Sequence, residues 1–367
     1  MKLLIVSERC STFRVKLIDN LVRALLSQNV EVVLLVGEAF NGSVAQEIEV
    51  LSPPRFRELS KSMDEHRYLE IFKIAFEAEI DQVHFCFFLD PQRLYLALET
   101  DDLAKELKFS YSIFGIAEYL RKAIYRHFHE ALLQQTYIKR VLIHSIHPET
   151  AQAKAKEMGI LDSNKVAYVH DPLYDPPEAL LIDKSMARRA LALPLDAQIV
   201  LYFGTYGFKK GPDLLLSVAK RFKDEPRVQF IFAGNTSTAT FDFDKGHYSW
   251  ANIRFDDRFI DEETAYLYFA ASDLVVQPYR RYYEFDTSGV LVQACLARRA
   301  VLVPDISPFK ETVNAYNLGQ TFKCEDADSL EEEILMILAQ KEQPNQRHFE
   351  KYISQIESWS TLADLIL

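Results

Sequence analysis

The sequence predicts an α/β protein made of two Rossmann-like domains, each with a doubly wound parallel sheet. The 367 residues exceed what one hydrophobic core usually holds, so two domains are expected. Runs of Val, Ile, Leu and Phe recur without polar alternation, which is typical of parallel strands covered on both faces. Amphipathic helical stretches separate these runs, and the pattern restarts after a Pro-rich segment at 165–181.

The first domain is predicted to span residues 1–182. It begins with a strand at 2–7, a helix at 13–29 and a second strand at 30–37. Further strands are predicted at 82–88, 109–115 and 140–145, with helical stretches between them. Because a helix connects each strand to the next, the strands run parallel and form a doubly wound sheet.

The second domain is predicted to span residues 183–348 and repeats this alternation. Helices are predicted at 212–222 and 262–271, and the strands at 198–207, 228–234, 252–257, 273–279 and 300–305. The tail at 349–367 is predicted to be helical and to cross back to the first domain. Ligands bind beyond the carboxyl ends of parallel strands, so a cleft between the two facing domains is expected.

Composition excludes several classes of protein. The net charge of −11 argues against a protein whose main task is binding nucleic acid. The four cysteines are widely scattered and lack metal-ligand spacing, so neither a metal site nor a disulfide framework is expected. The apolar run at 3–6 is too short for a signal-peptide core, and no stretch approaches the length of a spanning helix. A cytoplasmic protein is therefore expected.

Two loops of the second domain carry the chemistry of a phosphate site. After one strand, Gly204 allows close backbone approach, and Lys210 stands before a helix start. After another strand, Thr287 or Ser288 can cap a helix whose first amides, at 289–291, would face an anion. A Gly-Lys loop alone is usually a turn, and a Ser-Gly pair alone is usually a cap. Their occurrence in one domain favours a diphosphate held from both sides.

The order of these motifs resembles the GT-B glycosyltransferases, specifically glycosyltransferase family 4, also called group 1. Lys210 matches the family's diphosphate-binding lysine, whereas Thr205 replaces its usual arginine. Gly234, after the next strand, matches a glycine of the family in the same order along the chain. Arg258, Phe259 and Ile260 match the segment whose backbone usually receives the nucleobase. The resemblance covers nearly all of the second half and is weak in the first.

The family commonly places two glutamates eight residues apart, and this chain departs from that pattern. The second position is Gln293, which can still hydrogen-bond a ribose diol but without a charge. The first position, near the transferred sugar, is Phe285. The resemblance therefore leaves the sugar contact to Glu284 or Asp286. Together with Thr287, Ser288, Gly289 and Val290, these residues complete the predicted donor site.

The first half offers weaker candidates. Phe114 stands roughly where the family has a histidine, and His84, which follows predicted strand residues, is an alternative catalytic residue. A lone histidine in such apolar surroundings is more often structural. Arg14, in the first loop and helix, matches the family by position only. The segment 118–140 alternates basic with aromatic and apolar residues and is a candidate helical face for peripheral membrane contact.

The resemblance implies a retaining, metal-independent hexosyltransferase. Its donor would be a nucleotide diphosphate sugar of UDP or GDP type, and its acceptor a carbohydrate or lipid-linked hydroxyl in polysaccharide or glycolipid biosynthesis. No further cofactor is implied. Two alternatives stay open. A catalytically degenerate scaffold that only binds nucleotide sugars or a partner would explain Phe114, Thr205, Phe285 and Gln293. A sugar-nucleotide epimerase would need an acid and base pair, which the sequence does not show.

Overall fold

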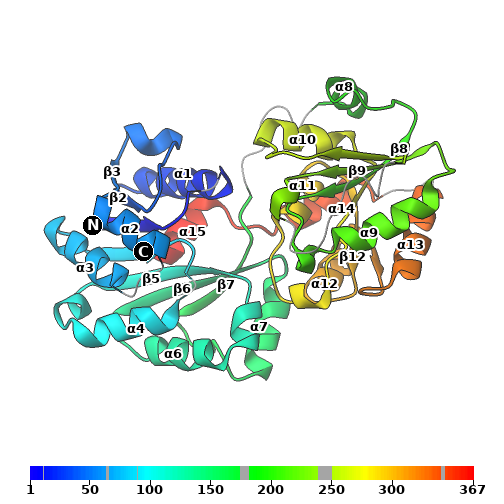
Figure 1. Cartoon of the computed structure of the whole chain (residues 1–367). Helices are drawn as coiled ribbons and strands as arrows, with labels where there is room; N and C mark the ends of the chain where they lie inside the picture. The colour runs from blue at the N-terminus through cyan, green and yellow to red at the C-terminus, as the bar shows by residue number, and fades with distance from the viewer. Residues whose placement is uncertain (11, 63–65, 89, 174–181, 239–249, 340–343) are drawn as a thin grey trace. The chain divides into compact units, whose positions relative to one another are not determined.

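The chain forms two compact α/β units in the computed structural model, which describes residues 1–10, 12–62, 66–88, 90–173, 182–238, 250–339 and 344–367 (Figure 1). The first unit consists of Met1–Tyr174 with Glu357–Leu367, and the second of Asp175–Ile356. The structure thus places the division before the boundary at 182/183 that the sequence predicts. The reason is that the last strand of the first sheet ends at His170.

The first unit contains a seven-stranded sheet in the order β3-β2-β1-β4-β5-β6-β7, parallel throughout. Its strands are β1 (Lys2–Ser7), β2 (Glu31–Val36), β3 (Glu49–Leu51), β4 (Gln82–Phe85), β5 (Lys108–Phe114), β6 (Ile138–Ser145) and β7 (Val166–His170). The sequence pattern does not predict β3 and β7. Both are edge strands and partly exposed, so they lack the continuous apolar run of a central strand.

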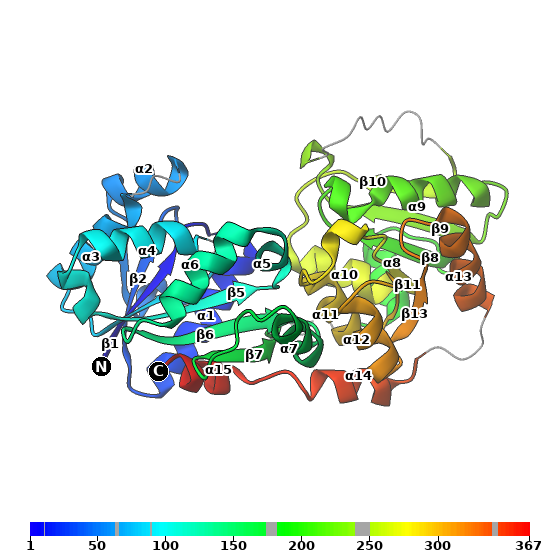
Figure 2. The same cartoon turned by 90° about the horizontal axis from the view of Figure 1, so that it is seen from below.

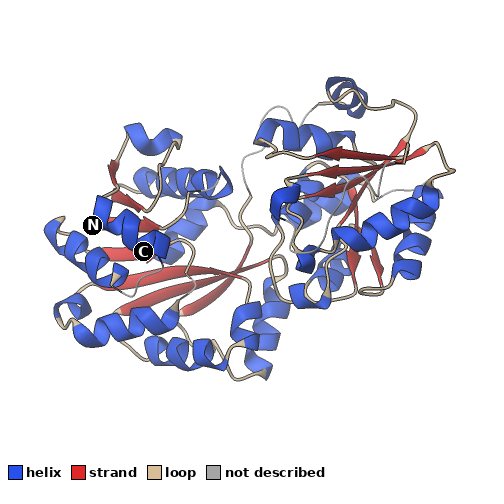
Figure 3. Ribbon diagram, in the orientation of Figure 1, coloured by secondary structure: helices blue, strands red, loops and turns tan. Residues whose placement is uncertain are grey.

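Helices cover both faces of the first sheet, as Figures 1 and 3 show. They are α1 (Thr12–Ser27), α2 (Pro54–Ser62), α3 (Arg67–Glu77), α4 (Pro91–Thr100), α5 (Ala117–Arg121), α6 (Ala123–Leu133), α7 (Pro148–Glu157) and α15 (Trp359–Ile366). Helices α1 and α15 pack together on one face, where Leu21, Leu362 and Ile366 join one buried cluster. On the other face, aromatic side chains of α3 meet those of β4 and β5, with Tyr68 against Phe85 at 5.8 Å.

The second unit contains a six-stranded parallel sheet in the order β10-β9-β8-β11-β12-β13. Its strands are β8 (Gln198–Phe203), β9 (Val228–Ala233), β10 (Ile253–Asp256), β11 (Leu274–Val276), β12 (Ala300–Pro304) and β13 (Gly319–Phe322). The five predicted strands are confirmed in position. The pattern does not predict β13, a short and partly exposed edge strand that begins with a glycine.

The helices of the second unit are α8 (Lys184–Ala190), α9 (Pro212–Ala219), α10 (Glu262–Ala271), α11 (Gly289–Leu296), α12 (Phe309–Tyr316), α13 (Ala327–Ala339) and α14 (Gln346–Ile353). Of these helices, α10 has the predicted bounds and α9 covers the first part of the predicted range 212–222. One face of the sheet is covered by α9 and α13, whose apolar side chains share a buried cluster with β8, β9 and β11. On the other face, Phe269 of α10 packs against Phe203 at the end of β8, with 5.0 Å between ring centroids.

The predicted tail at 349–367 is not one structural piece. Helix α14 belongs to the second unit and packs against α11 and α12 (Figure 2), whereas α15 belongs to the first. In the first unit, the indole N–H of Trp359 donates a hydrogen bond to the carbonyl oxygen of Leu173 at 3.0 Å. The apolar face of α15 is buried against α1, and this burial explains why the chain returns.

The prediction of one continuous helical face at 118–140 is wrong. Helix α5 ends at Arg121, Lys122 is extended, α6 ends at Leu133, and Ile138 already begins β6. The cations are also engaged locally. Arg121 and Lys122 pair with Glu118 at 2.9 Å and 2.7 Å, and the Arg126 guanidinium donates to backbone carbonyls in α5. The contact of this segment with a membrane therefore stays a prediction, and the described residues of 118–140 do not form one basic helical face that would support it.

Among the helices that the structure describes, none is long and apolar enough to cross a bilayer.

Candidate donor site in the second unit

The sheet of the second unit changes winding direction between its two central strands. From β8 the chain moves outward to β9 and β10, and it then returns to β11 and proceeds the other way. The loops after β8 and β11 therefore diverge at the carboxyl edge of the sheet. In doubly wound folds, such a switch point is where ligands bind. Both predicted phosphate loops begin at this point.

Direct contacts tie the two loops together. Arg280, in the loop after β11, makes a bidentate pair with Asp213 of α9, at 2.9 Å and 2.6 Å. The backbone N–H of Arg280 donates to the carbonyl oxygen of Lys209 at 2.9 Å. The Lys209 ammonium lies 3.0 Å from a carboxylate oxygen of Asp286. The structure thus brings together two segments that lie far apart in the sequence.

Two glycines make this close approach of backbones possible. Gly211 has φ 62°, and a Cβ there would lie 2.0 Å from the carbonyl oxygen of Pro278. Gly234, after β9, has φ 147°, and a Cβ there would lie 2.0 Å from the carbonyl oxygen of Gly204. Neither position can accept a side chain without movement of the backbone. The absence of side chains keeps the loops after β8, β9 and β11 in register at one edge.

Lys210 lies at the centre of this arrangement. Its ammonium nitrogen is 3.4 Å from the position that a Cβ on Gly204 would occupy, and 6.0 Å from the ring centroid of Tyr279. Burial lowers the pKa of Lys210 to about 8; the positive charge of Lys209 adds to this effect, and Asp286 opposes it. No carboxylate within the described residues forms an ion pair with Lys210, so its charge is available to an anion.

Helix α11 begins with a buried cap. Of the two predicted caps, Ser288 takes this role: its Oγ accepts the backbone N–H of Leu291 at 3.3 Å. The same Oγ lies 3.2 Å from the hydroxyl of Tyr279 and donates to Oε1 of Gln277 at 2.8 Å. Tyr279 therefore contacts the cap and also lies near Lys210. The backbone N–H groups of Gly289 and Val290 have no acceptor within the described chain, as a helix start leaves them.

The residues at 284–286, shortly before the cap, include the two carboxylates predicted to contact the sugar. Phe285 has φ 60°, its N–H donates to the carbonyl oxygen of Ser307 at 2.8 Å, and its side chain is 8% exposed. The phenyl ring thus packs inward. Asp286 is already paired with Lys209. Glu284 has no hydrogen bond or ion pair from its carboxylate within the described residues, and of the two predicted carboxylates it is the one left uncompensated.

The predicted nucleobase segment follows β10, at the edge of the sheet. Two strand spacings separate β10 from β8, or about 10 Å. The Nε of Arg258 donates to Asp256 at 2.9 Å, and Phe259 is 65% exposed. Ile260 lies next to it and is partly buried. Arg258 thus connects the loop to β10 through the Asp256 carboxylate, and the exposed ring of Phe259 lies on the same loop.

Two further predicted residues lie at the same edge. The side chain of Thr205 is exposed, and its carbonyl oxygen accepts a hydrogen bond from Tyr202 at 2.6 Å. Gln293 is partly buried in α11, one turn beyond the cap. The second unit therefore brings together Lys210, Glu284, Asp286, Gly204, Gly234 and the start of α11, with Arg258–Ile260 farther along the edge.

The first unit corrects the prediction for His84. This residue lies inside β4, not after it, and is fully buried. Its ring nitrogens lie 2.9 Å and 3.3 Å from the hydroxyls of Ser110 and Ser112. Burial, with a smaller contribution from His144, lowers the pKa of His84 to about 3, so the ring is neutral at physiological pH. His84 is a structural residue of the sheet, and Phe114 stacks on His144 in the same layer at 4.4 Å.

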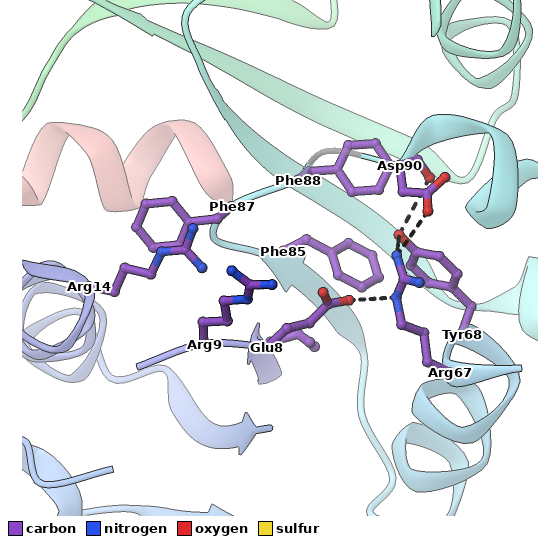
Figure 4. Close-up of a pocket in the computed structure, with 10 residues that line it drawn as sticks. Glu8, Arg9, Arg14, Arg67, Tyr68, Phe85, Phe87, Phe88 and Asp90 are labelled. Atoms are coloured by element: carbon purple, nitrogen blue, oxygen red, sulfur yellow. Dashed lines mark hydrogen bonds and ion pairs between the residues drawn. The ribbon is translucent and has the colours of Figure 1, made fainter. Parts of the chain in front are cut away.

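Sequence reasoning missed a pocket of about 150 Å³ in the first unit (Figure 4). Its lining includes Glu8 and Arg9 from the end of β1, Arg14 from α1, and Arg67 and Asp90 from other elements. Only Arg14 is among the positions noted from the sequence. The signal that could have found the rest is topological, because β1 and β4 are neighbours at which this sheet also changes direction.

The structure contains no cluster of three or more metal-ligating side chains among the residues that it describes.

Two doubly wound α/β units in one chain are the architecture of the GT-B fold. Residues 183–355, which make up most of the second unit, match the family model described as "Glycosyl transferases group 1". Most of the second unit is therefore similar to a group 1 glycosyltransferase domain.

Solved structures similar to the whole chain agree with this fold. Sucrose-phosphate synthase from Thermosynechococcus elongatus is 16% identical with a TM-score of 0.74, and the match covers 99% of this chain and 96% of that one. Anabaena HepE in complex with UDP is 14% identical with a TM-score of 0.69, covering 99% and 98%. UDP-GlcNAc 2-epimerase from Methanocaldococcus jannaschii is 13% identical with a TM-score of 0.59, covering 96% and 99%. No curated protein sequence matches the chain.

Proposed function

We propose that the chain transfers a sugar from a nucleotide diphosphate sugar to an acceptor hydroxyl, with retention of configuration and without a metal ion. The single observation that carries this proposal is that Tyr279 lies near Lys210 and also contacts the α11 cap, at the switch point of the second sheet. A cationic ammonium and the unpaired amides of Gly289 and Val290 suit a diphosphate. The group 1 match and the UDP complex of HepE support the same donor chemistry.

In the proposed reaction, the bond between the anomeric carbon and the diphosphate oxygen breaks, and the electron pair leaves with the diphosphate. Lys210 and the amides stabilise the negative charge that develops there, where a metal ion would otherwise do so. The acceptor oxygen bonds to the anomeric carbon on the face that the diphosphate leaves. Its proton passes to the departing diphosphate oxygen, which is the nearest base on that face. In this proposal Glu284 contacts the transferred sugar, because its carboxylate has no partner among the described residues.

A catalytically degenerate scaffold is the second candidate. Phe285 favours it, because its inward-packed ring leaves the family's glutamate position without a carboxylate. One of the similar structures is an epimerase, so the fold alone does not distinguish a glycosyltransferase from an enzyme with another activity. Turnover distinguishes the two functions, because a transferase and a binding protein would both bind a nucleotide sugar.

The deciding experiment incubates the full chain with a panel of UDP- and GDP-linked hexoses and measures released nucleotide, with and without a library of carbohydrate and lipid-linked acceptors. We expect release from at least one donor and a rise with a matched acceptor, whose glycoside keeps the donor's anomeric configuration. Chelation by EDTA should leave the rate unchanged. Calorimetric binding of a nucleotide sugar without release in any combination would instead identify the degenerate scaffold.

The lowered pKa of Lys210 predicts a pH-dependent affinity for the donor. The ammonium is charged below about pH 8 and loses its proton as the pH rises through that value. Diphosphate favours the charged form, so the Kd of UDP or GDP should be nearly constant below pH 7.5. It should then rise by up to about tenfold per pH unit above 8. Calorimetric titration between pH 6.5 and 9.5 would show this.

The matched control is Lys210→Arg, because a guanidinium stays charged throughout that pH range. Its nucleotide affinity should not weaken above pH 8, whatever its absolute value. A wild-type profile that stays flat to pH 9.5 would mean that Lys210 does not meet the diphosphate.

A further inference from the structure

The pocket in the first unit lies at the carboxyl edge of its sheet, where the loops after β1 and β4 part. It has about 150 Å³ of space, and the residues lining it come from β1, α1, α3, β4 and the segment before α4. Figure 4 shows Arg14 and Phe87 at one end, Arg67 and Asp90 at the other, and Arg9 between them. The pocket is built within one unit.

Arg67 forms the rigid end of this pocket. Its side chain is 1% exposed, and its guanidinium bridges Glu8 at 2.7 Å and Asp90 at 3.0 Å. Arg93 also pairs with Asp90, at 2.7 Å. The two cations, Arg67 and Arg93, balance the two carboxylates, so this end fixes the shape of the pocket and does not attract an anion.

The other end is positively charged and unbalanced. Arg9 and Arg14 both line the pocket, and neither forms an ion pair with a carboxylate among the described residues. The Arg14 guanidinium lies 4.3 Å from the ring centroid of Phe87, so the ring holds it in place. Burial lowers the pKa of Arg14, and the neighbouring charge of Arg9 lowers it further, whereas the charge of Glu8 opposes this effect. Glu8, the nearest acid along the chain, is committed to Arg67.

Two guanidinium groups that share a partly buried pocket repel each other until an anion enters. Each guanidinium presents a planar set of donors that matches a phosphate or carboxylate in a bidentate manner. Helix α1 begins at Thr12, between the two arginines in sequence, and its start adds a partial positive charge near the same end. The aromatic rings along the pocket, Phe85, Phe87 and Phe88, offer apolar surface to the rest of a ligand.

We propose that this pocket holds the phosphate group of a phosphorylated acceptor between Arg9 and Arg14. The inference rests on the proposed function and narrows the acceptor class: the hydroxyl that receives the sugar belongs to a molecule that also carries a phosphate. A sugar phosphate and a phosphate headgroup of a lipid share this chemistry, and the test below separates them.

The test measures phosphate binding to the full chain by calorimetry. The probes are inorganic phosphate, glucose 6-phosphate and mannose 6-phosphate, with the two neutral hexoses as controls. We expect the phosphorylated probes to bind and the neutral hexoses not to bind. Arg14→Gln and Arg9→Gln should each weaken phosphate binding by about 10- to 100-fold, as expected for the loss of charged hydrogen bonds. Arg9 is exposed, so its substitution leaves the fold intact.

Arg23→Gln is the matched control, since Arg23 lies on the same helix α1 and pairs with the exposed Glu47 away from the pocket. It should keep wild-type affinity. Sedimentation with vesicles containing phosphatidic acid supplies the second arm. Binding to vesicles and not to the soluble phosphates, again lost in Arg9→Gln, assigns the phosphate to a lipid; the reverse assigns it to a soluble sugar.

Several results would overturn the inference without touching the proposed function. One is phosphate binding that survives both arginine substitutions but disappears in Lys210→Ala, because the probe then occupies the donor site. A second is no binding of any phosphate probe or vesicle. A third is tight binding of glucuronate with no binding of phosphates, which would make the pocket a carboxylate site. Nucleotide release from the donor, measured separately, reports on the proposed function in each case.

Discussion

Substituting Lys210 by alanine is expected to lower the rate of nucleotide release from the active donor by about 100- to 1000-fold. This is the size of effect seen when one preorganised group that stabilises a developing negative charge is removed. The ammonium lies over Gly204, beside Tyr279 and the α11 cap, and no carboxylate in the described chain neutralises it. Initial rates at saturating acceptor, over a range of donor concentrations, would give both kcat and kcat/KM.

The two kinetic parameters separate two roles of the lysine. A fall in kcat and kcat/KM together means that Lys210 acts mainly on the departing diphosphate, whereas a higher KM alone means that it only binds the donor. Lys223→Ala, an exposed lysine of the same unit, serves as the control and should keep the wild-type rate. If Lys210→Ala retained full turnover, the proposed mechanism would be wrong.

Gly234→Ala is expected to lower the free energy of unfolding by about 3 kcal/mol and to abolish donor binding. The φ of 147° is unfavourable for alanine, and its Cβ would lie 2.0 Å from the carbonyl oxygen of Gly204. Gly204 lies next to the Lys210 ammonium, so relief of this contact moves the site. In scanning calorimetry the melting temperature should fall by roughly 6–12 °C, given about 2–4 °C per kcal/mol for a domain of this size.

Gly207→Ala provides the matched control within the loop after β8. Its φ is −71°, and nothing lies within 4 Å of the Cβ that alanine would add. The substitution should leave stability unchanged or raise it by up to about 1 kcal/mol, because alanine has fewer unfolded conformations. Equal effects of the two substitutions would contradict the view that the approach of two backbones makes Gly234 necessary.

The central strands and the helix starts of the second unit could be predicted because their signals are local. Strand β8 has an unbroken apolar run, and α10 spans the predicted residues 262–271 with Asp261 as its cap. The cap of α11 could be predicted for the same reason, although only the structure chooses Ser288 over Thr287. The unpredicted strands β3, β7 and β13 lie at sheet edges, where partial exposure removes the apolar signal.

Only the tertiary structure decided the roles of residues that depend on partners far away in the sequence. His84 has the residue type of a catalytic base, yet its place inside β4 against two serines makes it structural. Glu284 and Asp286 are equivalent in sequence, and the pair with Lys209 separates them. The pocket of the first unit needed Arg67 and Asp90 to meet Glu8 across long stretches of chain.

The sequence by itself therefore determined the α/β class, the repeated parallel sheets and the lysine and helix start of the proposed donor site. These follow from hydrophobic periodicity, glycines and caps, which act over a few residues. The tertiary structure decided which loops meet, which charges are neutralised and which remain open to a ligand. Those properties depend on burial and on electrostatic partners brought together by folding, and burial is not encoded at any single position.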